Sequence, residues 1–142
     1  MQTVASSNSA DRSMPKLVEY VEATPEVRAV FDDIKATRGV ADVNNLWKAF
    51  AIHPPTLART WSGVKEVMAP GELDPLTKEL LYLVASMVAG CTYCTAGHTA
   101  FARTKGMTDA MYGELLAIVG MAAETNRLAG ALRVPLEPAL RG

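Results

Sequence analysis

Both cysteines of the chain and one of its two histidines lie within eight residues, at Cys91, Cys94 and His98. Their spacing, C-x-x-C-x-x-x-H, puts all three side chains on one face of a helix, at positions i, i+3 and i+7. Two thiols placed in this way can attack an electrophile and then close a disulfide. The same three side chains can instead supply ligands to a zinc ion, or the cysteines can be small residues packed in a helical core.

The residues around the cysteines favour the redox interpretation. Gly90 directly precedes Cys91 and places the first thiol at the start of a helix, where unpaired backbone N–H groups and the helix dipole stabilise a thiolate. His98 follows Cys94 by one turn, close enough to exchange a proton with it directly or through water. A closed zinc site needs a fourth ligand. The only other histidine, His53, precedes two prolines, and a helix-end or surface role suits it better.

Glu79 is the next candidate, because it is a lone carboxylate in the most apolar helical segment of the chain. Its only basic neighbour in the sequence is Lys78. A buried carboxylate has to be protonated or bonded, and a histidine is the natural partner, since the carboxylate can orient the ring and raise its basicity. We therefore predict a Glu79–His98–Cys94 proton relay of the kind that activates nucleophiles. The alternative for Glu79 is a charge that merely favours the helix dipole.

Prolines and glycines divide the chain into helix-sized segments that position these residues. A capping residue followed by proline opens two of them, at Thr24-Pro25 and at Asp74-Pro75. No segment shows a convincing period of two, so the sequence predicts an all-α fold. We expect a compact bundle of about six helices with the C-x-x-C pair at the start of one helix. The expected helices lie within 25–38, 44–53, 55–69, 75–89, 91–105 and 109–130, with an extended tail from 134.

Two groups of apolar residues are expected to be covered. The helix that begins at Pro75 is apolar on nearly all sides, which predicts burial at the centre of the bundle. Trp47, Phe50 and Trp61 follow amphipathic spacing and are expected in the core or at a subunit interface. The apolar residues of the central helix are Leu80, Leu81, Leu83, Val84, Met87 and Val88.

Composition narrows the class of protein. The chain has 142 residues, 49% of them apolar, and a net charge of −1, so we expect one soluble domain over residues 16–142, with no basic surplus for nucleic acid. Residues 1–15 are polar and serine-rich, lack the apolar stretch of an export signal, and are expected to form a flexible arm.

The longest nearly apolar run, 80–91, is shorter than the roughly 20 residues of a membrane span. We expect a cytoplasmic protein that binds neither nucleic acid nor membranes.

The pattern E-x11-C-x-Y-C-x3-H, formed by Glu79, Cys91, Tyr93, Cys94 and His98, resembles the AhpD-like alkylhydroperoxidases of the carboxymuconolactone decarboxylase superfamily. The resemblance is sharpest over about residues 45–125 and includes the stretch HPPTLARTW. Five fixed positions make this pattern far more specific than a bare C-x-x-C.

The resemblance implies a peroxidase that needs no cofactor, neither haem nor metal. Cys94 would attack the peroxide and become a sulfenic acid, while Cys91 would protonate the departing alkoxide and then close the disulfide. Glu79 and His98 would supply the proton relay. A dithiol protein of lipoyl or thioredoxin type would reduce the disulfide again. The chain would assemble as a homotrimer or homohexamer.

Tyr93 stands where the best-studied branch of the family carries a second histidine, which marks it as a possible accessory residue. On an ideal helix its side chain points away from the face of the cysteines, so packing is its expected role. The decarboxylases of the superfamily lack the cysteine pair, which counts against that reaction. The alternative to a peroxidase is a non-catalytic helical assembly module whose cysteine pair binds a metal or senses oxidants.

Overall fold

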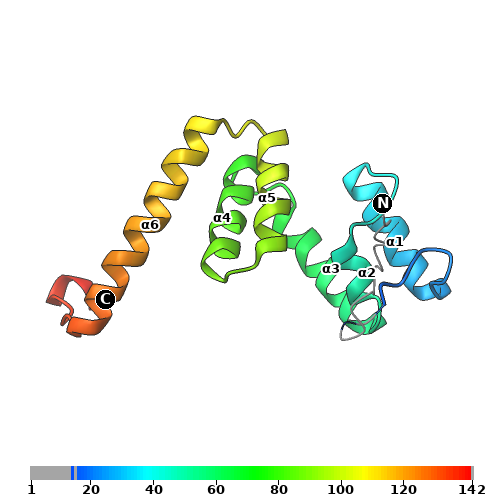
Figure 1. Cartoon of the computed structure of the whole chain (residues 1–142), viewed down its shortest axis with the longest axis horizontal. Helices are drawn as coiled ribbons and strands as arrows, with labels where there is room; N and C mark the ends of the chain where they lie inside the picture. Colours follow the sequence, from blue (N-terminus) through cyan, green and yellow to red (C-terminus); the bar gives the residue numbers. More distant parts are fainter. Residues whose placement is uncertain (1–13, 15, 142) are drawn as a thin grey trace, which may run out of the picture. The chain divides into compact units, whose positions relative to one another are not determined.

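The computed structural model describes Met14 and residues 16–141, and within them the chain is helical, with no β-strand. Six α-helices and one short 3₁₀-helix follow one another (Figure 1). The prediction of an all-α fold with about six helices is therefore confirmed, and the observed helix ends differ from the expected ones by only a few residues. The elements are α1 (Pro25–Arg38), α2 (Asn45–Phe50), α3 (Pro54–Met68), α4 (Pro75–Val88), α5 (Thr92–Thr104), α6 (Asp109–Leu132) and η1 (Pro138–Leu140).

The chain divides between Ala69 and Pro70 into two compact units. The first unit holds α1–α3, and the second holds α4–α6 and η1. The expectation of a single domain over residues 16–142 stays a prediction. The expected flexible arm, residues 1–15, lies outside the described residues apart from Met14.

The first unit is built around an aromatic core. Trp47 and Trp61 are almost fully buried and meet edge to face, with ring centroids 5.3 Å apart. Phe50 is half-buried against the same cluster. The amphipathic spacing of these three residues therefore predicted their place in the core. The other fully buried large side chains of this unit are Phe31, Ile34 and Leu57.

The second unit is a helical hairpin followed by a long helix. Asp74 caps α4 as expected, because its carboxylate accepts the backbone N–H of Thr77 at 3.0 Å. A three-residue turn reverses the chain after α4, so α4 and α5 lie side by side (Figure 1), and α6 packs more lightly against α4. The buried core of this unit consists of Leu83, Ala102, Met107 and Leu115.

The prediction that α4 is buried on all sides is wrong. Only Glu79, Leu83 and Ser86 are buried, whereas Leu81 is 56% exposed and Val88 is 75% exposed. The physical reason is that α4 is covered mainly by α5, on the face that carries Glu79, Leu83 and Ser86. Leu81 and Val88 lie outside this face, and the lighter packing of α6 against α4 leaves them exposed.

Helix α6 also exposes apolar side chains along much of its length. It is the one helix in the described part of the chain that is long and apolar enough, by length and composition, to cross a membrane. Its large exposed apolar residues are Leu116, Ile118, Met121, Leu128 and Leu132. The tail after α6, expected to be extended, contains the single turn η1.

Candidate active site

The turn between α4 and α5 sets the position of the first cysteine. Gly90 follows the end of α4 with φ of +69°, a left-handed conformation that glycine adopts without a steric penalty. Its N–H donates to the carbonyl of Met87 at 3.1 Å, and the N–H of Cys91 donates to the carbonyl of Ser86 at 3.0 Å. These two bonds form the usual glycine-terminated end of a helix. The next helix starts at once, so Cys91 is held at its first turn.

Cys91 is the N-cap residue of α5. Its Sγ accepts the backbone N–H of Cys94 at 3.2 Å, and the two cysteines form a disulfide with their Cα atoms 5.3 Å apart. The prediction of a C-x-x-C pair at a helix start is confirmed. In the reduced chain, this position gives a Cys91 thiolate a backbone donor and the positive end of the helix dipole. Both cysteines are half-buried.

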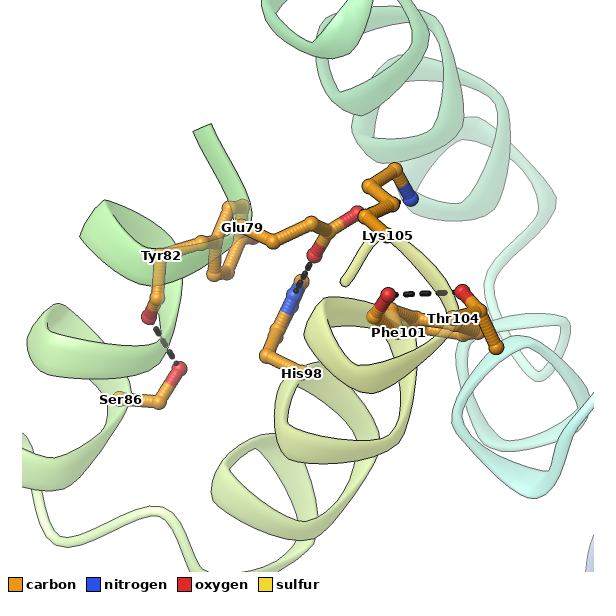
Figure 2. A network of polar contacts seen from close by, with 7 residues as sticks. All are labelled: Glu79, Tyr82, Ser86, His98, Phe101, Thr104 and Lys105. Carbon is orange, nitrogen blue, oxygen red and sulfur yellow. Dashed lines mark hydrogen bonds and ion pairs between the residues drawn. The ribbon is translucent and has the colours of Figure 1, made fainter. Parts of the chain in front are cut away.

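One turn beyond Cys94, His98 meets the carboxylate of Glu79 (Figure 2). The distance between His98 Nδ1 and Glu79 Oε2 is 2.8 Å. The second oxygen, Oε1, accepts from Lys105 Nζ at 2.9 Å. The Glu79 side chain is only 6% exposed and that of His98 14%, so the pair is nearly shielded from water. An ionised carboxylate only accepts hydrogen bonds, so Nδ1 donates in this bond. When the ring is neutral, Nε2 is then an acceptor.

The charge of Glu79 is stabilised by its partners. Burial alone raises the pKa of the Glu79 carboxyl, because a desolvated anion is costly. The hydrogen bonds from His98 and Lys105, together with the positive charge of Lys105, outweigh burial and hold the pKa below its ordinary value of 4.5. Glu79 is therefore an anion near neutral pH, able to orient the imidazole ring of His98.

Two aromatic rings fix the plane of the His98 ring. Tyr82 stacks on it, with ring centroids 3.9 Å apart and planes 19° from parallel. Phe101 meets it edge to face at 5.9 Å. Tyr82 belongs to α4, and its backbone carbonyl accepts a hydrogen bond of 2.8 Å from Ser86 Oγ on the next turn of the same helix (Figure 2). The ring of His98 thus has little freedom to turn away from Glu79.

The structure brings Glu79 and His98 together and places them beside the cysteines on α5, without joining the two groups. Within the described residues, no hydrogen bond links His98 to Cys91 or Cys94. One helical turn separates His98 from Cys94, a rise of roughly 6 Å along the axis. Tyr93, between the cysteines, is 47% exposed.

The structure adds nothing to the zinc interpretation. Among the described residues, no three or more His, Cys, Asp or Glu side chains are grouped so that they could hold a metal ion. His53 lies in the first unit, where it caps α3 and its Nδ1 accepts the N–H of Thr56 at 3.3 Å. His53 is exposed and stands at the start of α3, so the helix-end or surface role expected for it is confirmed. A zinc site at the cysteines rests on their spacing alone.

Two residues of the site were not predicted from the sequence. Lys78 is the basic neighbour of Glu79 in the sequence, but in the structure Lys105 bonds to Glu79 from the end of α5, 26 residues away in the chain. The stacking of Tyr82 on His98 was also missed. Helical spacing carried a signal for both: Tyr82 follows Glu79 by three residues, and Lys105 follows His98 by seven, so each lies on the same face as its neighbour.

The sequence model of the carboxymuconolactone decarboxylase family matches residues 55–137, more than half of the chain, and all the pattern positions from Glu79 to His98 lie inside the match. This chain belongs to the carboxymuconolactone decarboxylase family. A solved structure, the alkylhydroperoxidase AhpD core from Rhodospirillum rubrum, is 50% identical to this family member. The alignment covers 87% of this chain and 93% of that chain, with a TM-score of 0.83. No curated protein matches the chain significantly. The predicted AhpD-like fold is confirmed.

Proposed function

We propose that this family member is a thiol-dependent alkyl hydroperoxide reductase with Cys91 and Cys94 as its redox pair. The observation that carries the proposal is a cysteine pair at the start of α5, one turn from a histidine that a buried carboxylate holds in place. The similarity to an alkylhydroperoxidase AhpD core supports it. The protein then acts in the cytoplasm, where a disulfide formed in turnover is reduced again.

In the first step, the relay of Glu79 and His98 takes the proton of the Cys94 thiol. The thiolate attacks the terminal oxygen of a hydroperoxide, ROOH. An S–O bond forms as the O–O bond breaks, which leaves Cys94 as a sulfenic acid and releases an alkoxide. Cys91 protonates the alkoxide to the alcohol, ROH, and becomes a thiolate at the N-terminus of α5.

In the second step, the Cys91 thiolate attacks the sulfur of the Cys94 sulfenic acid. The disulfide forms and hydroxide leaves, taking back from His98 the proton that the relay removed from Cys94, so that water is the second product. Two thiols and one hydroperoxide thus give a disulfide, an alcohol and water. A dithiol protein of lipoyl or thioredoxin type then reduces the disulfide and is itself oxidised. Tyr93, partly exposed between the cysteines, is an accessory residue for access to the sulfurs in this proposal.

The proposal includes a homotrimer or homohexamer. The exposed apolar residues of α4 and α6 would be costly in water and are suited to cover one another in an assembly of identical chains. Sedimentation without detergent tests this: a mass of three or six chains is expected, and Ile118→Glu, which puts a charge on the exposed face of α6, should lower it. A monomer, or a protein that is recovered only with membranes, contradicts the assembly.

The reaction is tested by counting free thiols on the reduced, metal-free protein before and after one equivalent of cumene hydroperoxide. We expect rapid loss of two thiols per chain, with a Cys91–Cys94 link in the mass spectrum. Glu79→Gln should keep the fold, because the side chains have nearly the same shape, and slow the loss at least about tenfold, since a positioned base typically contributes 10²–10⁴-fold.

The matched control is Glu66→Gln, which changes an exposed carboxylate on α3 and should leave the rate unchanged. If the thiols do not react with the peroxide, the proposed peroxidase activity is wrong, and the non-catalytic module becomes the better interpretation. In that case, substitutions of Cys91 or His98 that remove a bound metal and also lower the stability of the protein would identify a metal-binding module. An unchanged rate in Glu79→Gln contradicts the relay.

A further inference from the structure

Lys105 is the one charged group of the site that the proposed reaction leaves without a role. It stands at the C-terminal end of α5, 26 residues from Glu79 in sequence, and its ammonium lies 2.9 Å from Glu79 Oε1. Glu79 is nearly fully buried, whereas the Lys105 side chain is 33% exposed. A lysine that reaches from the edge of the unit to a buried carboxylate has replaced part of its own hydration by this contact.

The backbone around Lys105 is fixed, so the contact does not depend on a flexible chain end. The N–H of Lys105 donates to the carbonyl of Ala102 at 3.0 Å, and the N–H of Met107 donates to the same carbonyl at 3.0 Å. Ala102 and Met107 are both buried in the core of the second unit. The turn that carries Lys105 is therefore held on both sides by the packed interior.

We propose that Lys105 is a positioning residue for the Glu79–His98 pair: by holding Oε1, it keeps Oε2 turned toward the Nδ1 proton of His98 and leaves Nε2 as the proton-accepting atom. This role rests on the proposed function and extends it. Among the described residues, the charged groups that act on Glu79 are Lys105 and His98, so without Lys105 the buried carboxylate would have to draw its counter-charge from a doubly protonated His98. That form has no free nitrogen to accept the proton of a thiol. Lys105 supplies the counter-charge, so His98 can stay singly protonated and keep Nε2 free to accept a proton.

The charges around the pair make this assignment specific. The groups that lower the pKa of Glu79 are His98 and Lys105, both from α5. The next cation on the same helix, Arg103, forms an ion pair with Asp109 of α6 at 2.7 Å and lies over the ring of Tyr112. Arg103 and Lys105 thus bear the same charge, two residues apart, but have different partners.

This difference provides the experiment. Lys105→Met removes the ammonium, Arg103→Met removes a neighbouring positive charge without touching Glu79, and Lys105→Arg keeps the charge. The reduced full-length protein is titrated while the ring nitrogens of its histidines are followed by NMR. The chain has only two histidines, so His53, in the first unit, serves as the internal reference. The rate of thiol loss with cumene hydroperoxide is measured over the same pH range.

In Lys105→Met, we expect the Glu79–His98 pair to take up its proton at a higher pH than in the wild type, because the nearby positive charge that opposes protonation is gone. The rate of thiol loss should fall roughly five- to tenfold on the acid side of neutral pH and recover at alkaline pH. This loss is smaller than the roughly 10²–10⁴-fold that a positioned base typically contributes, because Lys105→Met keeps the base itself. Lys105→Arg and Arg103→Met should keep the wild-type profile. A purely structural role for Lys105 would lower the rate equally at every pH.

A ring titration that Lys105→Met leaves unchanged overturns the proposal, whatever happens to the rate. So does an equal shift in Arg103→Met, which would show a general effect of charge, or a Lys105→Arg protein that behaves like Lys105→Met. The titration does not depend on turnover. If the wild-type thiols ignore the peroxide, the proposed function fails, while the response of the ring nitrogens still decides whether Lys105 controls the pair.

Discussion

Gly90→Ala tests how strongly the turn after α4 controls the cysteines. Gly90 has φ of +69°, and a Cβ added there meets nothing within 4 Å. The cost of an alanine is therefore backbone strain alone, about 1–2 kcal/mol for an L-residue in the left-handed region. Alanine also lowers the conformational entropy of the unfolded chain, which offsets about 0.4–1 kcal/mol of this strain in the free energy of unfolding. We expect a net loss of about 1 kcal/mol in the free energy of unfolding.

Gly39 provides a matched control, because it ends α1 with φ of +65° and also has nothing within 4 Å of an added Cβ. Gly39→Ala should cost a similar free energy in the first unit. Only Gly90→Ala strains the turn whose N–H groups bond to Met87 and Ser86 and hold Cys91 in place. If opening this turn relieves the strain, about 1 kcal/mol reduces the correctly placed population up to about fivefold.

The assay combines two measurements on the reduced protein, so that the disulfide does not contribute to stability. Urea unfolding should show a lower midpoint for both variants, and thiol loss with cumene hydroperoxide should slow severalfold only for Gly90→Ala. Equal midpoints for Gly90→Ala and the wild type would refute the strain argument. An equally slow thiol reaction in Gly39→Ala would show that the effect on the cysteines is not local.

Three further outcomes are expected. Leu83→Ala removes a side chain with no exposed surface and should cost about 2–5 kcal/mol in thermal or urea unfolding; a loss below that range would mean that the α4–α5 core repacks easily. Because the folded pKa of Glu79 is lowered, its partners stabilise the fold above the ordinary value of 4.5 and lose this effect as the pH falls through the folded pKa. Glu79→Gln should therefore flatten the acid side of a stability-against-pH curve, and a curve parallel to that of the wild type would contradict this. Treatment with a metal chelator should change neither the helix content by circular dichroism nor the thiol reaction, whereas loss of either would favour the metal-binding module.

Local features of the sequence predicted most of the fold. A capping residue followed by proline opens α1 and α4, and Gly90 ends α4 and starts the cysteine helix, because each signal acts on a few neighbouring backbone groups. The contact between Glu79 and His98 was predicted for a different reason. A carboxylate inside an apolar helix needs a partner, and the cysteine segment offered only one histidine on its thiol face.

The remaining features depend on tertiary structure that helical periodicity does not reveal. Lys78 is next to Glu79 in sequence, but the hairpin of α4 and α5 reverses the chain and brings Lys105 to the carboxylate instead. Leu81 and Val88 are as apolar as the buried Leu83, yet they face away from α5. A helix that is covered by its own chain and a helix that is covered by another copy of the chain show the same apolar pattern in sequence. Periodicity therefore cannot tell which of these two coverings an apolar face has.

The order of the functional residues along α5 gives the site a direction. Cys91 and Cys94 lie at the N-terminal end, where the helix dipole favours a thiolate, and Lys105 lies at the C-terminal end, where the dipole favours a cation. His98 lies between them, with Glu79 reaching it from α4. The N-terminal end of α5 thus stabilises negative charge that develops on a sulfur. The C-terminal end stabilises the cation that balances Glu79. A single helix can thereby support both ends of the proposed proton relay, while α4 contributes only the carboxylate and the stacked ring that hold the histidine.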